Sequence, residues 1–496
     1  MYGNRSEDPD ASDRPSLPDR RFAALRGCER LLSGVRPQSI RERLADLAGP
    51  LPDAGPGPDA APGSDAAPGP DAAPGSDAAA GPHAVPDLDG RPDQYGDGVV
   101  RTLEHRVAGL LGTEDATFFP TGTMAQQIAL RIHAEAAGPR TVVTHPLAHT
   151  DRHERHALGV LSGLRSLWPT TEPRQPTAEE LRALDEPYAA LSLELPLRDA
   201  GFVLPGWAEL VELAAVVREE HGAALHLDGA RIWESAVALG RPLPEVVALA
   251  DSVYVSFYKT LGGISGAALA GPGGFVRTAR AWRHRYGGQL YQQWPFALAA
   301  LTGLERELPR LPGYVAHART VAAALARAFA AVPGARVHPA PPHTHQFQLW
   351  LPHPVGELEE AGLGLAEDTG IGLFGAWRAG GPPGLSMTEV TVAAPALDWT
   401  AADVTVAATA APTRARARGR AGASREARAP ARAGTKDPVR GPARAATRAP
   451  AVRPKLRLRR RGAAGCCPSR CWSRCSCWCS SPVPASPARA TATPTS

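Results

Sequence analysis

The sequence predicts an α/β protein whose mostly parallel sheet is covered by helices on both faces. Two observations lead to this fold class. Several short segments are apolar throughout, and segments with helical periodicity lie between several of them. Strands that are apolar on every residue, instead of alternating, are typical of a parallel sheet buried on both sides. The expected strands comprise residues 116–119, 141–144, 190–195, 223–227 and 252–257.

Helices are predicted between and after these strands. Residues 40–47 form one helical candidate, and Leu103, Val107, Leu110 and Leu111 recur at helical spacing in the next. Further helices are expected at 123–137, from Pro205 to a stop at Gly222, and at 311–331. The last of these leads to a second domain from about residue 335, with an alternating strand at 346–351. A final helix begins near Thr400, where Thr400 and Asp403 match a capping box.

Two segments have a composition that does not form a core. Gly and Pro together make up 100 of the 496 residues, and a hexapeptide of Pro, Gly, Asp, Ser and Ala repeats four times from Pro56. Such a repeat lacks the apolar stripe of a solenoid, so it predicts a disordered linker. The expected organisation is a disordered N-terminus (1–27), an N-terminal segment of the main fold (28–50), a linker (51–90), a large domain (91–330), a small C-terminal domain (331–411) and a low-complexity tail (412–496).

Charge and cysteine divide the chain at the same place. From Ala411 onward there are 20 basic and 2 acidic residues, whereas the rest carries 34 basic and 48 acidic residues. Six of the seven cysteines also lie in the tail, and only Cys28 lies before it. A single thiol suits a reducing compartment, and the polar N-terminus and short apolar runs predict neither a signal peptide nor a membrane span. We therefore expect a cytoplasmic protein.

The tail has three interpretations. Its arginines would neutralise phosphates in a nucleic-acid tail, and its six cysteines would bind metal. The third interpretation is a shifted reading frame in GC-rich DNA, which yields Arg, Ala, Pro, Gly, Cys and Trp. The abrupt junction and the lack of paired Cys-x-x-Cys spacing favour the shifted frame. We expect no specific nucleic-acid partner and no metal site.

Lysine gives the first indication of chemistry. The chain has three lysines, and Lys259 is the only one before the tail. Arginine stays protonated, whereas a lysine amine can be tuned to act as a nucleophile. A body that uses arginine for every other basic side chain therefore points to a specific need for the Lys259 amine.

Three features appear in the order that pyridoxal phosphate needs. Asp228 and Lys259, 31 residues apart, each come at the end of an apolar strand. At the carboxyl edge of the sheet, such a lysine would form a Schiff base and such an aspartate would keep a pyridine nitrogen protonated. Gly122 and Thr123 lie between a strand and a helix, where backbone N–H groups would hold a phosphate.

At these residues the chain resembles the threonine aldolase / β-eliminating lyase family of fold-type-I pyridoxal-phosphate enzymes. The motifs are Tyr95-Gly-Asp97, Phe119-Pro-Thr-Gly-Thr123, Leu225-His-Leu-Asp-Gly-Ala-Arg231 and Ser256-Phe-Tyr-Lys-Thr-Leu-Gly262. The resemblance covers about residues 28–400 outside the repeat. It implies a fold-type-I large domain and a smaller α+β C-terminal domain.

The resemblance also implies roles for individual residues. Lys259 is the Schiff-base lysine, and Asp228 pairs with the pyridine nitrogen. Arg231 lies near the phenolic oxygen of the cofactor and the carboxylate of the substrate. Gly122 and Thr123 bind the phosphate. His149 stacks on the pyridine ring.

Four histidines cluster at 145–156, and they admit other roles. After His149 as the stacking residue, His153 is the next candidate as an acid or base, and a metal cluster comes last. Two stretches depart from the family pattern. Residues 192–199 read Ser-Leu-Glu-Leu-Pro-Leu-Arg-Asp, without the histidine that relatives place there, and the carboxylate-binding element is reduced to Leu32-Ser33-Gly34, with Ser33 as the substrate residue.

The predicted activity is that of a pyridoxal-phosphate lyase. It would cleave the Cα–Cβ bond of a β-hydroxy-α-amino acid to give glycine and an aldehyde. Elimination at Cβ of another amino acid is the alternative enzyme, and a non-catalytic nucleic-acid-binding protein acting through the basic tail is the alternative of another class. Tyr95-Gly-Asp97 resembles the segment with which relatives cross over to the active site of a neighbouring subunit. The resemblance therefore implies a homodimer or homotetramer.

Overall fold

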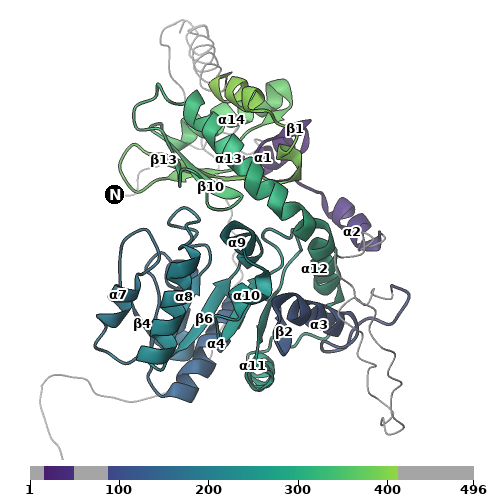
Figure 1. Ribbon diagram of the computed structural model, residues 1–496. Coiled ribbons are helices and arrows are strands. Elements are labelled where there is room, and N and C mark those ends of the chain that lie inside the picture. The colour runs from purple at the N-terminus through teal and green to yellow at the C-terminus, as the bar shows by residue number, and fades with distance from the viewer. Residues whose placement is uncertain (1–15, 50–87, 411–496) are drawn as a thin grey trace, which may run out of the picture. The chain divides into compact units, whose positions relative to one another are not determined.

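The computed structural model describes residues 16–49 and 88–410, and its centre is a seven-stranded sheet (Figure 1). The strand order is β2-β8-β7-β6-β5-β3-β4. Strands β4, β3, β5, β6 and β7 run parallel, while β8 is antiparallel to both β7 and β2. The strands are β2 (Asp115–Phe119), β3 (Thr141–Val143), β4 (Arg165–Leu167), β5 (Ala190–Glu194), β6 (Ala224–Gly229), β7 (Ser252–Ser256) and β8 (Ala267–Gly271).

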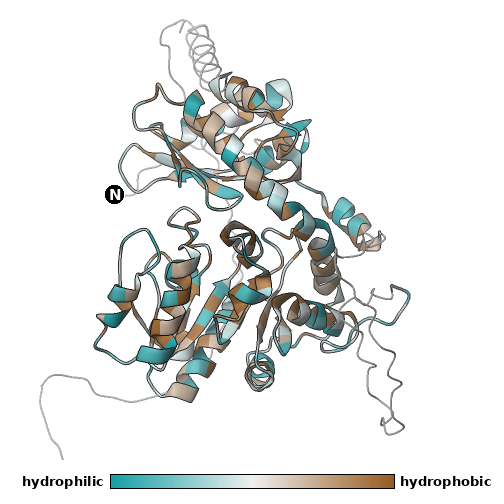
Figure 2. Cartoon of the chain, viewed as in Figure 1, coloured by the Kyte–Doolittle hydropathy of each residue, from teal (hydrophilic) through white to brown (hydrophobic). Residues whose placement is uncertain are grey.

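Helices cover both faces of this sheet, which explains why strands such as β5 and β7 are buried at every residue and are mostly apolar. Leu225 and Leu227 of β6 belong to the same cluster as helices α3, α8, α9, α10 and α12, whereas Tyr254 of β7 packs with α4 and α11 on the other face. The helices are α3 (Val99–Leu111), α4 (Gly122–Ala137), α5 (His149–Arg152), α6 (Ala157–Ser162), α7 (Ala178–Arg182), α8 (Trp207–Ala215), α9 (Ile232–Leu239), α10 (Leu243–Val247), α11 (Gly273–Arg285) and α12 (Trp294–Glu307). Figure 2 shows the brown, apolar residues along these strands and the inner faces of the helices.

The predicted α/β fold is therefore confirmed, and all five predicted strands are present. Two further strands of this seven-stranded sheet were not predicted. Strand β8 consists of Ala, Leu and Gly, which carry no β-branched signal, and β4 is only three residues long. The helix expected from Pro205 to Gly222 is α8, which continues as a π-helical turn over Val216–Glu220.

A second, antiparallel sheet follows the long helix α13 (Leu311–Ala328), and both the predicted helix at 311–331 and the predicted strand at 346–351 are present. Its order is β12-β13-β10-β9, and α13 packs against β9 and β10. The elements are β9 (Arg336–His338), β10 (Gln346–Leu351), α14 (Val355–Thr369), β11 (Ile371–Gly372), β12 (Trp377–Ala379) and β13 (Ser386–Thr391). A last helix covers residues 401–410, and Thr400 and Asp403 form its predicted capping box.

The N-terminal segment completes this second core. Strand β1 (Arg30–Leu31) pairs with β11, and Leu32 is fully buried in the core of the small domain. Helix α2 (Ile40–Ala48) confirms the predicted helix at 40–47 and is capped by Ser39 and Glu42.

One expectation for the N-terminus is wrong. Residues 17–26 were expected to be disordered, but they form α1 (Leu17–Arg26), which is capped by Ser16. The helix has no buried residue, so its sequence shows no apolar residues at helical spacing that would have predicted it. Instead, Arg20 bonds to Glu360 and Glu367 of α14 at 2.8 and 2.7 Å. Of the other low-complexity predictions, the tail and the linker apart from residues 88–90 lie outside the described residues.

Candidate active site

Asp228 lies at the carboxyl end of β6, at the centre of the sheet. It is 3 % exposed, and one carboxylate oxygen accepts a hydrogen bond from the backbone of Ala230 at 3.1 Å. Burial raises the pKa of Asp228, and the charges of Lys259 and His149 partly offset this effect. A buried carboxylate with so few donors is a site that favours a cationic partner.

Lys259 follows the next strand, β7, and belongs to a turn that closes when Gly263 donates to the carbonyl of Phe257 at 2.8 Å. Burial and the neighbouring Arg231 charge lower the pKa of the Lys259 amine to about 8, while Asp228 opposes the shift. A substantial fraction of this amine is therefore neutral near pH 8. A neutral, buried amine is the form in which lysine acts as a nucleophile.

The N-terminus of α4 lies close to Asp228 and Lys259 and forms the third part of the site. The Thr121 hydroxyl caps the helix by accepting from Met124 N at 3.3 Å, and the first N–H groups of any helix lack partners within it. A Cβ atom on Gly122 would lie 2.2 Å from the Tyr254 hydroxyl. The sequence therefore requires glycine where the helix end approaches β7.

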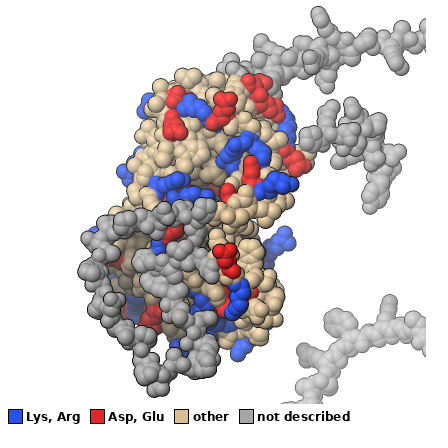
Figure 3. All heavy atoms as spheres, turned by 90° about the vertical axis from the view of Figure 1, so that its right-hand side faces the viewer, with Lys and Arg blue, Asp and Glu red and all other residues tan. Residues whose placement is uncertain are grey.

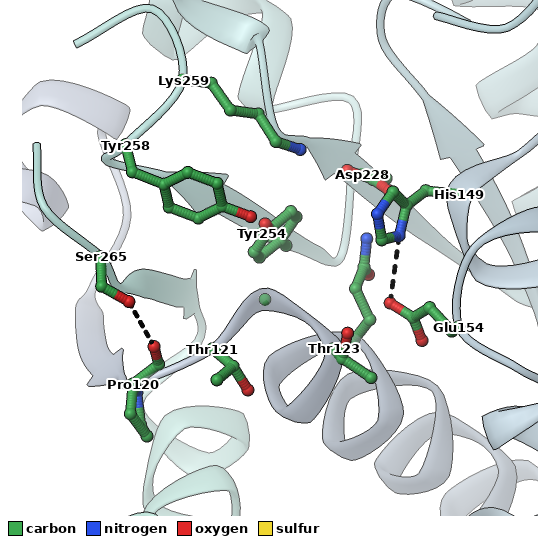
Figure 4. A pocket seen from close by; sticks show the side chains of 12 residues that line it. Pro120, Thr121, Thr123, His149, Glu154, Asp228, Tyr254, Tyr258, Lys259 and Ser265 are labelled. Atoms are coloured by element: carbon green, nitrogen blue, oxygen red, sulfur yellow. Dashed lines mark hydrogen bonds and ion pairs between the residues drawn. The ribbon is translucent and has the colours of Figure 1, made fainter. Parts of the chain in front are cut away.

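These elements surround one cavity of about 140 Å³ (Figure 4). Lys259, Asp228 and His149 line it from different elements, and the helix end lies below them. The lining residues are Pro120, Thr121, Gly122, Thr123, Gln126, His149, Glu154, Asp228, Tyr254, Tyr258, Lys259 and Ser265.

His149 begins the short helix α5, where its backbone N–H donates to Glu194 at 2.7 Å. Its Nδ1 lies 3.3 Å from Glu154 Oε1, and Gln127 donates to the other Glu154 oxygen at 2.9 Å. The bond to Glu154 raises the pKa of His149, although burial opposes it. Because a carboxylate only accepts, Nδ1 carries the proton and Nε2 is left with the lone pair when the ring is neutral.

Three predicted site residues do not line this cavity. Arg231 is buried, and its Cζ lies 5.3 Å from the centroid of the Phe202 ring. Its charge lowers the pKa of Lys259. His153 bonds to Asp199 at 2.9 Å. Ser33 accepts a hydrogen bond from Thr391 N at 3.0 Å in the small domain.

Other lining residues were not predicted from the sequence. Tyr254 lies on β7, before the turn that carries Lys259, and Gln126 lies one helical turn after Gly122 on α4. The period of the helix could have pointed to Gln126, because residues four apart share a face. Glu154 had no sequence signal, since its partners lie on α4 and α5.

Comparison with known proteins identifies the family. The sequence profile of a family described as beta-eliminating lyase matches residues 90–349. The chain belongs to this family. It is therefore a lyase, its cofactor is pyridoxal phosphate, and its fold is that of the fold-type-I enzymes.

Curated relatives and solved structures agree with this family. Low specificity L-threonine aldolase of Escherichia coli K12 is 32% identical over 226 residues, which cover 44% of this chain and 67% of that protein. Low-specificity L-threonine aldolase 1 of Arabidopsis thaliana is 28% identical over 263 residues, covering 51% and 71%. A structure from Exiguobacterium sp. 255-15, assigned as an aromatic amino acid beta-eliminating lyase/threonine aldolase, is 31% identical, with a TM-score of 0.65, and covers 80% of this chain and 99% of that one.

The residues around the cavity fit the cofactor. The cofactor carries an anionic phosphate, a ring nitrogen that becomes cationic on protonation, and a carbonyl group that reacts with amines. The cavity presents the N-terminus of a 16-residue helix, a buried carboxylate and a lysine amine, one for each group. Gly122 and Thr123, at this helix end, both line the cavity.

Two further findings concern metal ions and membranes. Within residues 16–49 and 88–410, no group of three or more His, Cys, Asp or Glu side chains is arranged to hold a metal ion. None of the helices in the same ranges combines the length and apolarity needed to cross a membrane.

Proposed function

We propose that this protein cleaves the Cα–Cβ bond of β-hydroxy-α-amino acids, releasing glycine and an aldehyde. The observation that carries the proposal is the convergence of the Lys259 amine, the Asp228 carboxylate and the His149 ring on one cavity. The names of the relatives from E. coli and A. thaliana, both threonine aldolases, support the same reaction class.

The residues around the cavity have separate roles in this reaction. Bound pyridoxal phosphate supplies an electron sink that stabilises negative charge on a substrate carbon. Lys259 provides the amine that holds the cofactor covalently, and Gly122 and Thr123 hold its phosphate through backbone N–H groups. Asp228 keeps a proton on the ring nitrogen, because its buried carboxylate favours a cationic neighbour.

His149 is the residue we assign to proton transfer and to stacking on the cofactor ring. Glu154 holds the proton on Nδ1, so Nε2 is the atom that would take the proton of the substrate β-hydroxyl. His153 lies beside it, with ring centroids 5.4 Å apart, but its own Nε2 is bonded to Asp199. We therefore rank His153 second for this role.

Arg231 and Ser33 are our candidates for the carboxylate of the substrate. Arg231 Nε is buried without a hydrogen-bond partner, and a substrate carboxylate would satisfy it. Ser33 keeps a hydroxyl proton to donate, because its oxygen serves as the acceptor for Thr391 N.

The alternative enzyme is a lyase that eliminates a group from Cβ of another amino acid. It is favoured by the segment at residues 194–199, which contains no histidine, and by the likeness to the Exiguobacterium protein, whose assignment includes aromatic amino acid beta-eliminating lyase. An amino-acid panel separates the two reactions. The aldolase forms glycine and an aldehyde, whereas the eliminating enzyme forms ammonia and a keto acid. Lys259→Ala serves as the inactive control, and formation of ammonia without glycine would refute the proposal.

We also infer a homodimer or homotetramer in which Tyr95-Gly-Asp97 reaches a neighbouring subunit. Tyr95 is 56% exposed and packs edge-on against Tyr291, which is 55% exposed, with ring centroids 5.4 Å apart. Two large exposed rings side by side are typical of an interface. Sedimentation of the full chain tests this inference, and a fully active monomer would contradict it.

The remaining proposals concern domain limits and location. We place the large domain at 91–330 and the small domain at 331–411, and we infer a cytoplasmic enzyme because Cys28 is the only thiol in the described ranges. Basic and acidic side chains are interspersed on the face shown in Figure 3. The alternative of a nucleic-acid-binding protein depends on the basic tail, which lies outside the described residues.

A further inference from the structure

A chain of hydrogen bonds leads from the cofactor cavity into the core. Gln126 Oε1 lies 2.7 Å from His226 Nε2, and His226 Nδ1 lies 2.8 Å from the Ser252 hydroxyl. The same hydroxyl lies 2.7 Å from His133 Nε2. The chain crosses from α4 to β6 and β7 and back to α4, and three of its members are at most 2% exposed.

The direction of every bond in this chain can be worked out. Burial lowers the pKa of His226 to about 3 and that of His133 to about 4, so both rings are neutral. Gln126 Oε1 only accepts, so His226 Nε2 carries the proton and Nδ1 is an acceptor. Ser252 therefore donates to His226 and accepts from His133. Each of the three hydrogen bonds therefore has one donor and one acceptor. The bond to His226 holds the Gln126 carbonyl oxygen away from the cavity.

The Gln126 amide nitrogen, Nε2, takes no part in this chain of hydrogen bonds. Gln126 is 1% exposed and lines the cavity together with Asp228, and its Nε2 is buried without a hydrogen-bond partner. A buried N–H donor without an acceptor is costly, so native proteins satisfy nearly all such groups. The partner must come from what the cavity binds.

We propose that Gln126 is a further cofactor-binding residue, donating a hydrogen bond from Nε2 to an oxygen of the bound cofactor. His226, Ser252 and His133 are positioning residues, because they keep the donor side of the amide towards the cavity. The opposite orientation would turn a carbonyl oxygen towards an anionic ligand and repel it. This inference rests on the cavity being the pyridoxal-phosphate site.

The test is a titration of the cofactor-free protein with pyridoxal phosphate, followed by tryptophan fluorescence. Gln126→Leu removes the donor at similar volume and should weaken binding about 10-fold or more, as expected for one hydrogen bond to a charged acceptor. Gln126→Glu keeps an acceptor for His226 but places a carboxylate oxygen in the cavity. It should weaken binding more than Gln126→Leu does.

Ser252→Ala tests the positioning residues. It leaves Gln126 in place and frees the amide to turn, so the affinity should fall between those of the wild type and Gln126→Leu. Nitrogen NMR of His226 gives a second readout, since the neutral ring should carry its proton on Nε2 in the wild type but exchange between the Nε2 and Nδ1 tautomers in Ser252→Ala. Gln348→Leu is the matched control, because Gln348 is also 1% exposed but lies on β10. It should change thermal stability without changing cofactor affinity.

The outcomes separate this inference from the proposed function. If the wild type fails to bind pyridoxal phosphate, the assignment of the cavity is wrong. If the wild type binds it and Gln126→Leu binds it equally well, a water molecule satisfies the amide and the role of Gln126 is refuted. If Gln126→Leu does not fold, Gln126→Glu decides the question, since it preserves the bond to His226.

Discussion

Gly122→Ala is the substitution whose effect the structure defines most closely. The added methyl group would lie 2.2 Å from the hydroxyl oxygen of Tyr254, 2.9 Å from Cζ and 3.2 Å from Cε2. Tyr254 is 3% exposed in the middle of the sheet, and α4 is packed against β7, so neither side moves away freely. Overpacking of this kind costs about 1–3 kcal/mol. Helix propensity favours alanine by at most about 1 kcal/mol, so the clash should determine the sign.

Urea denaturation of the cofactor-free protein measures this cost, and a titration with pyridoxal phosphate measures the effect on the cavity. We expect Gly122→Ala to lose about 1–3 kcal/mol of unfolding free energy and to bind the cofactor more weakly, because the methyl group pushes the helix end out of place. Adding Tyr254→Phe removes the nearest atom and should restore part of the stability. Gly362→Ala in α14 meets no atom within 4 Å and should be neutral or slightly stabilising. A Gly122→Ala protein with wild-type stability and affinity would refute the reasoning.

Three further predictions concern charge. Asp228→Asn should retain the cofactor, measured by its absorbance, but lose roughly 100-fold or more in kcat, because a neutral amide no longer holds the ring-nitrogen proton; unchanged turnover would contradict this role. Glu154→Gln should lower the pKa of His149 and shift the acid limb of the kcat profile to lower pH; an unmoved NMR titration of His149 would rule out their coupling. His133 and His226 have pKa values of about 4 and about 3, below the ordinary value of about 6.5, so the unfolded chain binds more protons and stability is lost as pH falls below about 6.5. At pH 5 each ring should cost about 2 kcal/mol in urea denaturation, and a flat profile between pH 7 and 5 would exclude this effect.

The sequence predicted the parts of the fold that carry a local signal. Strands β5 and β7 are buried at every residue because helices cover both faces of the sheet, and the predominance of apolar residues in the predicted strands is visible without coordinates. Strand β8 was missed because small residues fill it, and its place between β2 and β7 depends on pairing with distant segments. Helix α1 was missed because none of its residues is fully buried and ion pairs contribute to its contacts with α14, so its sequence shows no apolar stripe.

The same distinction applies to the site. Asp228 and Lys259 were found because each ends an apolar strand, and Lys259 is conspicuous among arginines. The helix period places Gln126 on the face of Gly122, but its hydrogen-bond partner lies on another element, and Glu154 was missed because its partners lie on α4 and α5. The bond from Gln126 to His226 spans 100 positions, and the spacing of the sequence gives no account of it.

The most direct test of the account is the identity of the residue that binds the cofactor covalently. Sodium borohydride reduction of the enzyme loaded with pyridoxal phosphate fixes that link, and peptide mapping then locates it. The chain has only three lysines, Lys259, Lys436 and Lys455, so the map gives an unambiguous answer. The account predicts the label on Lys259 and no label in the Lys259→Ala protein. Label on Lys436 or Lys455, or none after reduction of a loaded enzyme, would contradict it.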